Sequence, residues 1–419
     1  MKSMLPFLLW LFFLPVTGQT IVQTQADSYT RYELLPPVTQ SFRIIYDVSA
    51  TTPGVRYYFN TLRRGSRHTV ERVTDLHTGE PLRWRIVDGL EAQSMGYTAA
   101  AEDTDYLAVE LARPVPVNGE ARLRIDKTYM DPASYFFREE TIYFERSLGI
   151  ERNSVVLPKG YELIACNYPS QVQLEEDGRI KISFINTSPA AVPLKLEARP
   201  LSATANTDNV ARPELRREQV SVKVPDPGRA RVGLNLSERA FQDREIVYFL
   251  QQPETHAFRL YHDYTESREG MDRYLNVVRA GSKVENPSAY VLDTGERLKV
   301  ETLRGKAISE KGIDIGAPIE EDSEVVVIWF DPVKKGASTR LRIEETYIDE
   351  NRYLLYEDEL IWDRAFGRNR NTVILPDGWF LVDCLVPAVI DRTSDGRVRL
   401  HFVNPGPGAL ETWIRARRR

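Results

Sequence analysis

Apolar and polar residues alternate along much of this chain. In residues 122–127 and 397–402, every second position is Leu, Ile, Val, Phe or Lys, and Arg, Asp or His stand between. A period of two is typical of a β-strand with one buried and one wet face. Asp177-Gly178 and Asp395-Gly396 separate strand-like runs, so we expect hairpin turns whose Asp and Gly both tolerate positive φ. No segment has the period of a long amphipathic helix, and the pattern predicts an all-β protein.

The chain contains an internal repeat. Residues 41–44 match residues 257–260, and residues 78–80 match residues 294–296, both at an offset of 216. The offset then changes by two between Ile86 and Pro114. From there it stays at 218, as in the match of Arg152-Asn153 to Arg370-Asn371. We therefore predict two tandem, homologous β-sandwich-like modules at residues 27–200 and 218–419, joined by a polar linker at residues 201–217.

The first residues have the order of a secretory signal peptide. Lys2 supplies a positive charge, residues 5–16 are almost wholly apolar, and small or polar residues follow from Thr17. We expect residues 1–18 to be removed after Gly18. An uncleaved anchor is the alternative, but the apolar run is shorter than the ~20 residues that a membrane span needs. The mature chain is then exported, periplasmic or extracellular, and without a membrane span.

Composition excludes several classes of function. A net charge of −5 in 419 residues gives no basic surface that would attract nucleic acid. The five His residues have no His or Cys at a metal-ligand spacing, so no metal is predicted. No Gly-rich phosphate loop and no Gly-x-Ser-x-Gly elbow occur in the sequence, and no cofactor is predicted.

The densest motif shared by the two repeats combines an acid, two arginines and an amide. Its arginines could clamp a carboxylate, sugar or phosphate, because guanidinium presents a planar fork of donors. The alternative is a structural loop, with an acid–Arg pair, a Gly at positive φ and an Asn bonded to nearby backbone. The candidate binding residues are Glu145, Arg146, Arg152 and Asn153 in the first repeat, and Asp363, Arg364, Arg370 and Asn371 in the second.

Three further features have two interpretations each. Glu139 with Glu145, or Glu357 with Asp363, could form the carboxylate pair of a hydrolase, although such pairs are common in a chain with 60 acids. Asn186 and Asn235 begin N-glycosylation sequons that matter only in a eukaryotic protein. Cys166 and Cys384 occupy equivalent positions, and their apolar strand context predicts buried free thiols instead of a bridge between the modules.

One segment of each repeat resembles a known family. Residues 73–82, then residues 106–111, Pro114, Gly119 and residues 123–129, are similar to the N-terminal β-domain of M1-type metallopeptidases, and the likeness covers about the first two-thirds of each module. The resemblance implies a β-domain built of short strands and Gly turns. The His-Glu-x-x-His sequence of the catalytic domain does not occur in this chain, so no catalytic residue and no zinc carry over.

Two hypotheses about function follow. The first is an exported, non-enzymatic protein that binds a protein or a glycan at the cell envelope. The second is a hydrolase, or a hydrolase accessory, that acts on glycans or peptides through a dispersed carboxylate and arginine site. Equivalent shallow surfaces on both repeats favour binding, whereas a deep polar pocket in only one repeat favours an enzyme.

Overall fold

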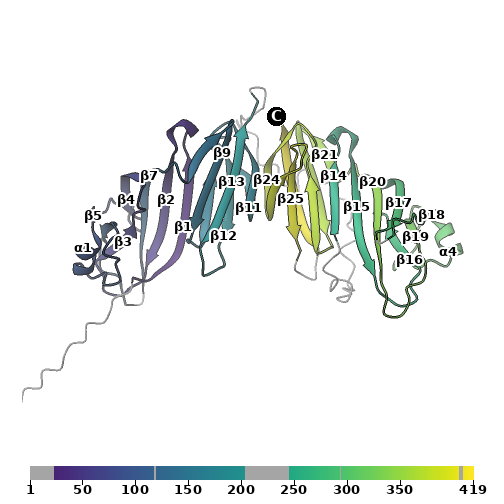
Figure 1. The fold of residues 1–419 in the computed structure, drawn as a ribbon, viewed down its shortest axis with the longest axis horizontal. Coiled ribbons are helices and arrows are strands. Elements are labelled where there is room, and N and C mark those ends of the chain that lie inside the picture. Colours follow the sequence, from purple (N-terminus) through teal and green to yellow (C-terminus); the bar gives the residue numbers. More distant parts are fainter. Residues whose placement is uncertain (1–22, 118, 203–244, 293, 405–408) are drawn as a thin grey trace, which may run out of the picture. The chain divides into compact units, whose positions relative to one another are not determined.

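A computed structural model describes residues 23–117, 119–202, 245–292, 294–404 and 409–419. The predicted signal peptide, the linker beyond Ser202 and the sequon at Asn235 lie outside these ranges. Strands dominate the described residues, and the few helices have six residues or fewer (Figure 1). The all-β prediction is therefore confirmed. Among the described residues, no helix has the length and apolar character to cross a bilayer.

The chain divides into two compact units that do not coincide with the repeats. Of the described residues, the first unit holds those in 23–28 and 45–127, and the second holds those in 29–44 and from 128 onward. The first unit contains a three-stranded sheet in the order β3 (Tyr57–Thr61), β6 (Tyr106–Glu110) and β5 (Trp84–Val87). It also contains β4 (Arg67–Asp75), helix α1 (Gly89–Ser94) and parts of β1 (Gln25–Leu34), β2 (Ser41–Ala50) and β7 (Ala121–Met130).

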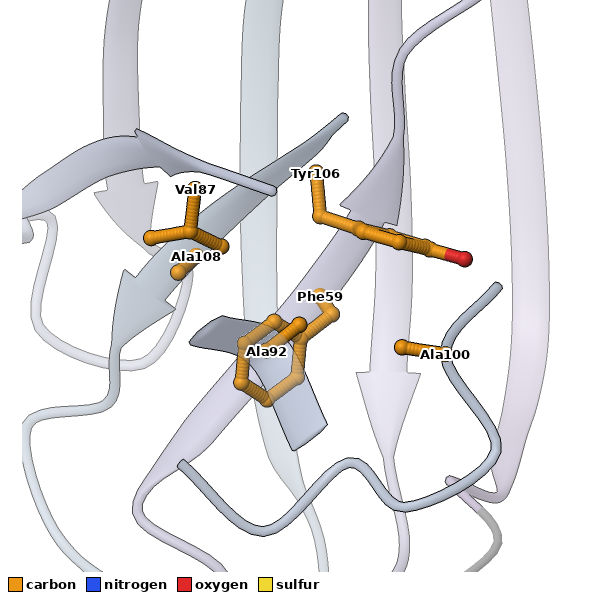
Figure 2. Close-up of a cluster of buried hydrophobic side chains, with 6 residues drawn as sticks. All are labelled: Phe59, Val87, Ala92, Ala100, Tyr106 and Ala108. Atoms are coloured by element: carbon orange, nitrogen blue, oxygen red, sulfur yellow. The ribbon is translucent and has the colours of Figure 1, made fainter. Parts of the chain in front are cut away.

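Helix α1 covers one face of this small sheet. The Asp88 carboxylate caps its first turn by accepting a hydrogen bond from the Glu91 N–H at 2.8 Å. A Cβ on Gly89 would lie 2.0 Å from the Ala101 carbonyl oxygen, so only glycine fits there. The buried side chains between helix and sheet come from α1, all three strands and the loop before β6; they are Phe59, Val87, Ala92, Ala100, Tyr106 and Ala108 (Figure 2).

The second unit contains the remaining strands. Those of the first repeat are β8 (Tyr135–Arg138), β9 (Thr141–Leu148), β10 (Arg152–Val156), β11 (Tyr161–Leu174), β12 (Ile180–Ile185) and β13 (Val192–Pro200). Those of the second repeat are β14 (Glu245–Leu250), β15 (Ala257–Glu266), β16 (Arg273–Val277), β17 (Lys283–Val291), β18 (Lys299–Arg304), β19 (Glu324–Trp329), β20 (Thr339–Ile348), β21 (Tyr353–Tyr356), β22 (Glu359–Phe366), β23 (Arg370–Ile374), β24 (Trp379–Arg392), β25 (Val398–Val403) and β26 (Leu410–Arg418). Short helical turns are η1 (Pro37–Thr39), η3 (Pro253–Thr255) and α4 (Lys306–Glu310).

Long strands link two layers in the second unit. The first half of β11 pairs with β13, and β13 pairs with β9, whereas the second half of β11 pairs with β12. Aromatic rings meet between the layers, with Phe42 of β2 5.4 Å from Phe144 of β9. β24 makes the same two sets of pairings with β26 and β25. A strand that changes partner along its length is the corner of a sandwich.

The order of elements recurs along the chain. β2 and β15 start 216 residues apart, which is the offset of the first sequence matches. β7 and β20 start 218 residues apart, which is the offset of the later matches. Between them, the Leu62 N–H donates to the Asp105 carbonyl, as the Val278 N–H does to the Glu324 carbonyl. This pairing gives β6 and β19 a larger offset than either. The second repeat is therefore lengthened before β19 and slightly shortened after it. The superposition of the two modules remains a prediction.

Two hairpins refine the expected turn chemistry. The turns after β11 and β24 form at Asp177-Gly178 and Asp395-Gly396, with φ of 81° at Gly178 and 85° at Gly396. The turns are where the sequence predicts them, and only the glycine of each pair adopts positive φ. Non-glycine residues take positive φ instead at the β8–β9 turn, at 46° for Glu139 and 68° for Glu140.

The repeats meet through β11 and β24, which pair antiparallel (Figure 1). Cys166 lies opposite Ile390, and Val172 lies opposite Cys384. Ile390 is the repeat equivalent of Val172, so these are the same contact made in both directions. Such reciprocity is the mark of a local twofold axis. Each cysteine faces an aliphatic residue and not the other cysteine, and both thiols are free and buried, as the sequence predicts.

Both thiols should be unreactive in the folded protein. Burial raises the pKa of the Cys384 thiol to about 12 and also raises the pKa of the Cys166 thiol. We expect a chromogenic disulfide reagent to detect no thiol in the native, unreduced protein and two in denaturant. Absence of both thiols in denaturant would contradict this result, because it would require a bridge.

Candidate functional site

The shared motif places its first arginine inside the protein. Arg146 of β9 is 10% exposed, and its Nη1 lies 3.1 Å from Asp131 Oδ2. Its guanidinium lies over the rings of Phe42, at 5.3 Å, and Tyr129, at 5.8 Å. Cation–π contacts of this kind are strengthened by loss of water. Arg146 therefore supports the core and is not presented to a ligand.

The second repeat builds the same arrangement. Arg364 Nη1 lies 2.8 Å from Asp349 Oδ2, and the guanidinium lies 5.0 Å from the centre of the Phe258 ring. In both repeats the arginine pairs with an aspartate from earlier in the chain, in the loop after β7 or β20. The motif's own acids, Glu145 and Asp363, are not these partners. The first arginine of each motif thus pairs with an acid from outside the motif.

The motif asparagine fixes the loop that precedes it. Asn153 is 1% exposed, and its Nδ2 donates to the Ile150 carbonyl at 2.6 Å. Asn371, also 1% exposed, donates to the Arg368 carbonyl at 2.8 Å. The expected Asn-to-backbone bond is thus present in both repeats. Gly149 and Gly367 do not have positive φ, so the expected role of these glycines is wrong.

A second buried asparagine holds the same end of each repeat. Asn186 Nδ2 donates to the Ala190 carbonyl at 2.9 Å, and Asn404 Nδ2 donates to the Phe366 carbonyl at 2.8 Å. Asn186 is 6% exposed, so the nitrogen that would carry a glycan is buried and bonded. Asn186 is therefore a structural residue. The sequence signal for its role was that Asn404 stands at the equivalent position of the second repeat.

The second arginine of the motif is the part left at the surface. Arg152 begins β10 between Tyr29 of β1 and Ile185 of β12, and Ile185 is 57% exposed. We call these three residues the Arg152 row. The equivalent Arg370 row consists of Glu245, Arg370 and Val403, and Val403 is 69% exposed. Each row places a guanidinium beside an exposed aliphatic side chain.

The proposed carboxylate pairs do not come together. Glu139 is exposed in the turn after β8, whereas Glu145 lies well along β9. Thr141 to Glu145 alone spans roughly 13 Å of strand, and glycosidase carboxylates lie about 5–9.5 Å apart. Glu357 and Asp363 have the same relation in β21 and β22.

One polar group in the second repeat has no signal in the sequence. His401 Nδ1 lies 3.1 Å from Thr372 Oγ1, and His401 Nε2 lies 3.2 Å from Asp391 Oδ1. Thr372 is only 4% exposed, and Asp391 is already held by both Nε and Nη2 of Arg399 at 2.7 Å.

These contacts stabilise the ionised carboxylate of Asp391 more than they raise the reactivity of the Thr372 hydroxyl. Burial raises the pKa of Asp391, but bonds and charge from Arg399 and His401 lower it overall. Thr372, Asp391 and His401 come from three neighbouring strands, β23, β24 and β25. Because they lie far apart in the sequence, their spacing could not predict that they meet. Within the described ranges, no three His, Cys, Asp or Glu side chains gather as metal ligands.

One buried position carries opposite charges in the two repeats. Lys127 of β7 donates from Nζ to Asn60 Oδ1. Its equivalent is Glu345 of β20, which accepts from Asn276 Nδ2 at 2.7 Å. Glu345 is 3% exposed, its Oε1 has no hydrogen-bond partner, and burial raises its pKa to about 7. The second repeat therefore contains a carboxyl that is partly protonated near neutral pH.

Known proteins give limited comparisons. No protein-family model and no curated protein match this chain. A solved M1 zinc metallopeptidase from Deinococcus radiodurans matches at 15% identity and a TM-score of 0.29, over 43% of this chain and 42% of that chain. An aminopeptidase N family protein from Idiomarina loihiensis matches at 8% identity and a TM-score of 0.24, over 41% of this chain and 29% of that chain.

A putative protease from Parabacteroides distasonis matches over 93% of this chain and 92% of that chain, at 9% identity and a TM-score of 0.25. The chain spans less than half the length of the M1 structures it matches. These matches confirm the resemblance to M1 metallopeptidases. At such TM-scores the resemblance carries no argument about activity.

Removing one partner of the buried ion pair should destabilise the protein strongly. We expect Arg364→Met to lower the free energy of unfolding by about 3–5 kcal/mol, because the charge of Asp349 stays buried with only the hydrogen bonds from the Asn351 and Arg352 N–H groups. The double variant Arg364→Met/Asp349→Asn should lose less than the single variant, because Asn removes the buried charge and keeps an acceptor for those N–H groups. Urea unfolding measures both, with Arg370→Met as the exposed control. Equal losses in the single and double variants would contradict the assignment.

Glu345 should make stability depend on pH. Its folded pKa of about 7 lies above the ordinary 4.5, so its contribution is present below pH 4.5 and is lost as pH rises through 7. The loss is on the order of 3 kcal/mol. Glu345→Gln should therefore be more stable than wild type at pH 8 and similar to it at pH 4.5.

The control for this experiment is Glu344→Gln, a change on the opposite face of the same strand. Unfolding by urea at pH 4.5, 6, 7 and 8 gives the slope of the free energy of unfolding against pH. If Glu345→Gln leaves this slope unchanged, Glu345 is not the source of the pH dependence.

Proposed function

We propose that this chain is an exported, non-enzymatic protein that binds a protein or a glycan at the cell envelope. The observation that carries the proposal is the recurrence of an exposed arginine beside an exposed aliphatic residue, in the Arg152 row and the Arg370 row. Arg146, Asn153 and their equivalents in the second repeat are packed inside the protein, so core packing explains their recurrence. Packing does not explain an exposed Ile185 or Val403.

The chemistry of the rows suggests the kind of ligand. A guanidinium fork suits a carboxylate, which acidic protein side chains and acidic sugars both carry. An aliphatic neighbour gains free energy when an apolar group covers it, at about 25 cal/mol per Å². A protein segment offers both contacts at once, and we favour it over a glycan.

The hydrolase alternative has less support. Its carboxylates lie at separate places along β8–β9 and β21–β22, and Arg146 and Arg364 are bound to aspartates in the core. What both rows expose in common is an arginine beside an aliphatic side chain, which can hold a ligand.

Crosslinking in the native host tests the proposal. A photoreactive amino acid in place of Ile185 or Val403 should give crosslinked products with an envelope component, and Arg152→Glu/Arg370→Glu should abolish them. A probe at Val117, which is 79% exposed and belongs to neither row, serves as the control. Products that persist in the double variant, or their absence at both positions, would refute this role. An acidic-glycan array probed with the same variants separates the two ligand classes.

A further inference from the structure

The three-stranded sheet of the first unit has an apolar face that remains uncovered at one edge. Cross-strand partners form a row of Tyr58 on β3, Val109 on β6 and Trp84 on β5. Tyr58 is 1% exposed and Val109 is 0% exposed, whereas Trp84 is 39% exposed. In the next row, Leu107 is 0% exposed and Ile86 is 48% exposed. Burial therefore ends at β5, although the apolar pattern continues through it.

The backbone of β5 is also open on that side. β5 is at the edge of its sheet, next to β6 alone. The Glu110 N–H donates to the Arg83 carbonyl, so residues 83, 85 and 87 direct their polar backbone groups toward β6. The N–H and C=O groups of Trp84 and Ile86 then point away from the sheet. An extended chain can pair with such groups.

The second repeat has less apolar side chains at the equivalent edge positions. β18 places Val300 and Thr302 where β5 has Trp84 and Ile86. The alternate positions are charged at both strands, with Arg83 and Arg85 at β5 and Lys299 and Glu301 on β18. The charge is therefore shared, and the exposed apolar pair is particular to β5. Fold alone thus does not require Trp84 and Ile86 at this edge.

We infer that β5 is a docking edge for an extended segment of another protein, which adds a fourth strand to the sheet. The segment needs apolar residues at alternate positions to cover Trp84 and Ile86. The residues between them should be acidic, because Arg83 and Arg85 are exposed on the other side of the strand and Glu91 of α1 pairs with only Arg85. Backbone bonds supply affinity in this mode, and alternate side chains supply specificity. The inference does not depend on the Arg152 and Arg370 rows.

A synthetic peptide tests this docking edge on the full chain. The probe is a fluorescent octapeptide of alternating Val and Glu. We expect saturable binding, with the amides of Trp84 and Ile86 exchanging hydrogen at least about tenfold more slowly in the complex. Trp84→Lys should weaken binding at least about tenfold. Val38→Asp, at a residue that is 80% exposed elsewhere, should not change it.

A charge exchange keeps the test independent of folding defects. Arg83→Glu should prefer a Val/Lys octapeptide over the Val/Glu peptide. Absent binding, unprotected β5 amides or an unchanged preference would overturn the inference. So would self-association of the chain that Trp84→Lys abolishes, because the occupant would then be a second copy. Arg152→Glu/Arg370→Glu should bind the peptide normally, which separates this result from the proposed function.

Discussion

A buried arginine–aspartate pair on aromatic rings organises each repeat. Arg146 reaches from β9 to Asp131 in the loop after β7, and Arg364 reaches from β22 to Asp349 after β20. A guanidinium inside a core is tolerable only when its charge is paired and its face is packed. The rings of Phe42 and Phe258 supply that packing. The pair therefore ties β9 to the loop between β7 and β8, and β22 to the loop between β20 and β21.

The same fold tolerates different chemistry where this constraint does not act. At one buried position the first repeat has Lys127 and the second has Glu345, and an asparagine partners both because its amide offers an acceptor or a donor. At one sheet edge the first repeat exposes Trp84, whereas the second has the smaller Val300. The two repeats thus share a scaffold. They differ in the charged group at one buried position and in the apolar surface exposed at one sheet edge.

The site could be predicted only in part from the sequence. The repeat identified Arg146, Arg152 and Asn153 as important, because all three recur at one offset. It could not separate a core residue from a surface residue, since both recur. That distinction depends on the loop that supplies Asp131 and on the strands beside Arg152, and neither lies next to the motif in sequence. The group of Thr372, His401 and Asp391 was missed for the same reason.

The sequence by itself determined the strand class, the recurring order of elements and the state of the cysteines. Each depends on local physics: a period of two exposes one face, glycine tolerates positive φ in a turn, and Cys384 lies on an apolar strand face. Tertiary structure alone decided the reciprocal pairing of β11 with β24, the partner of each buried arginine and the open edge at β5. These features join residues far apart in the chain, and hydrophobic periodicity specifies which face of a strand is buried but not which strand lies beside it.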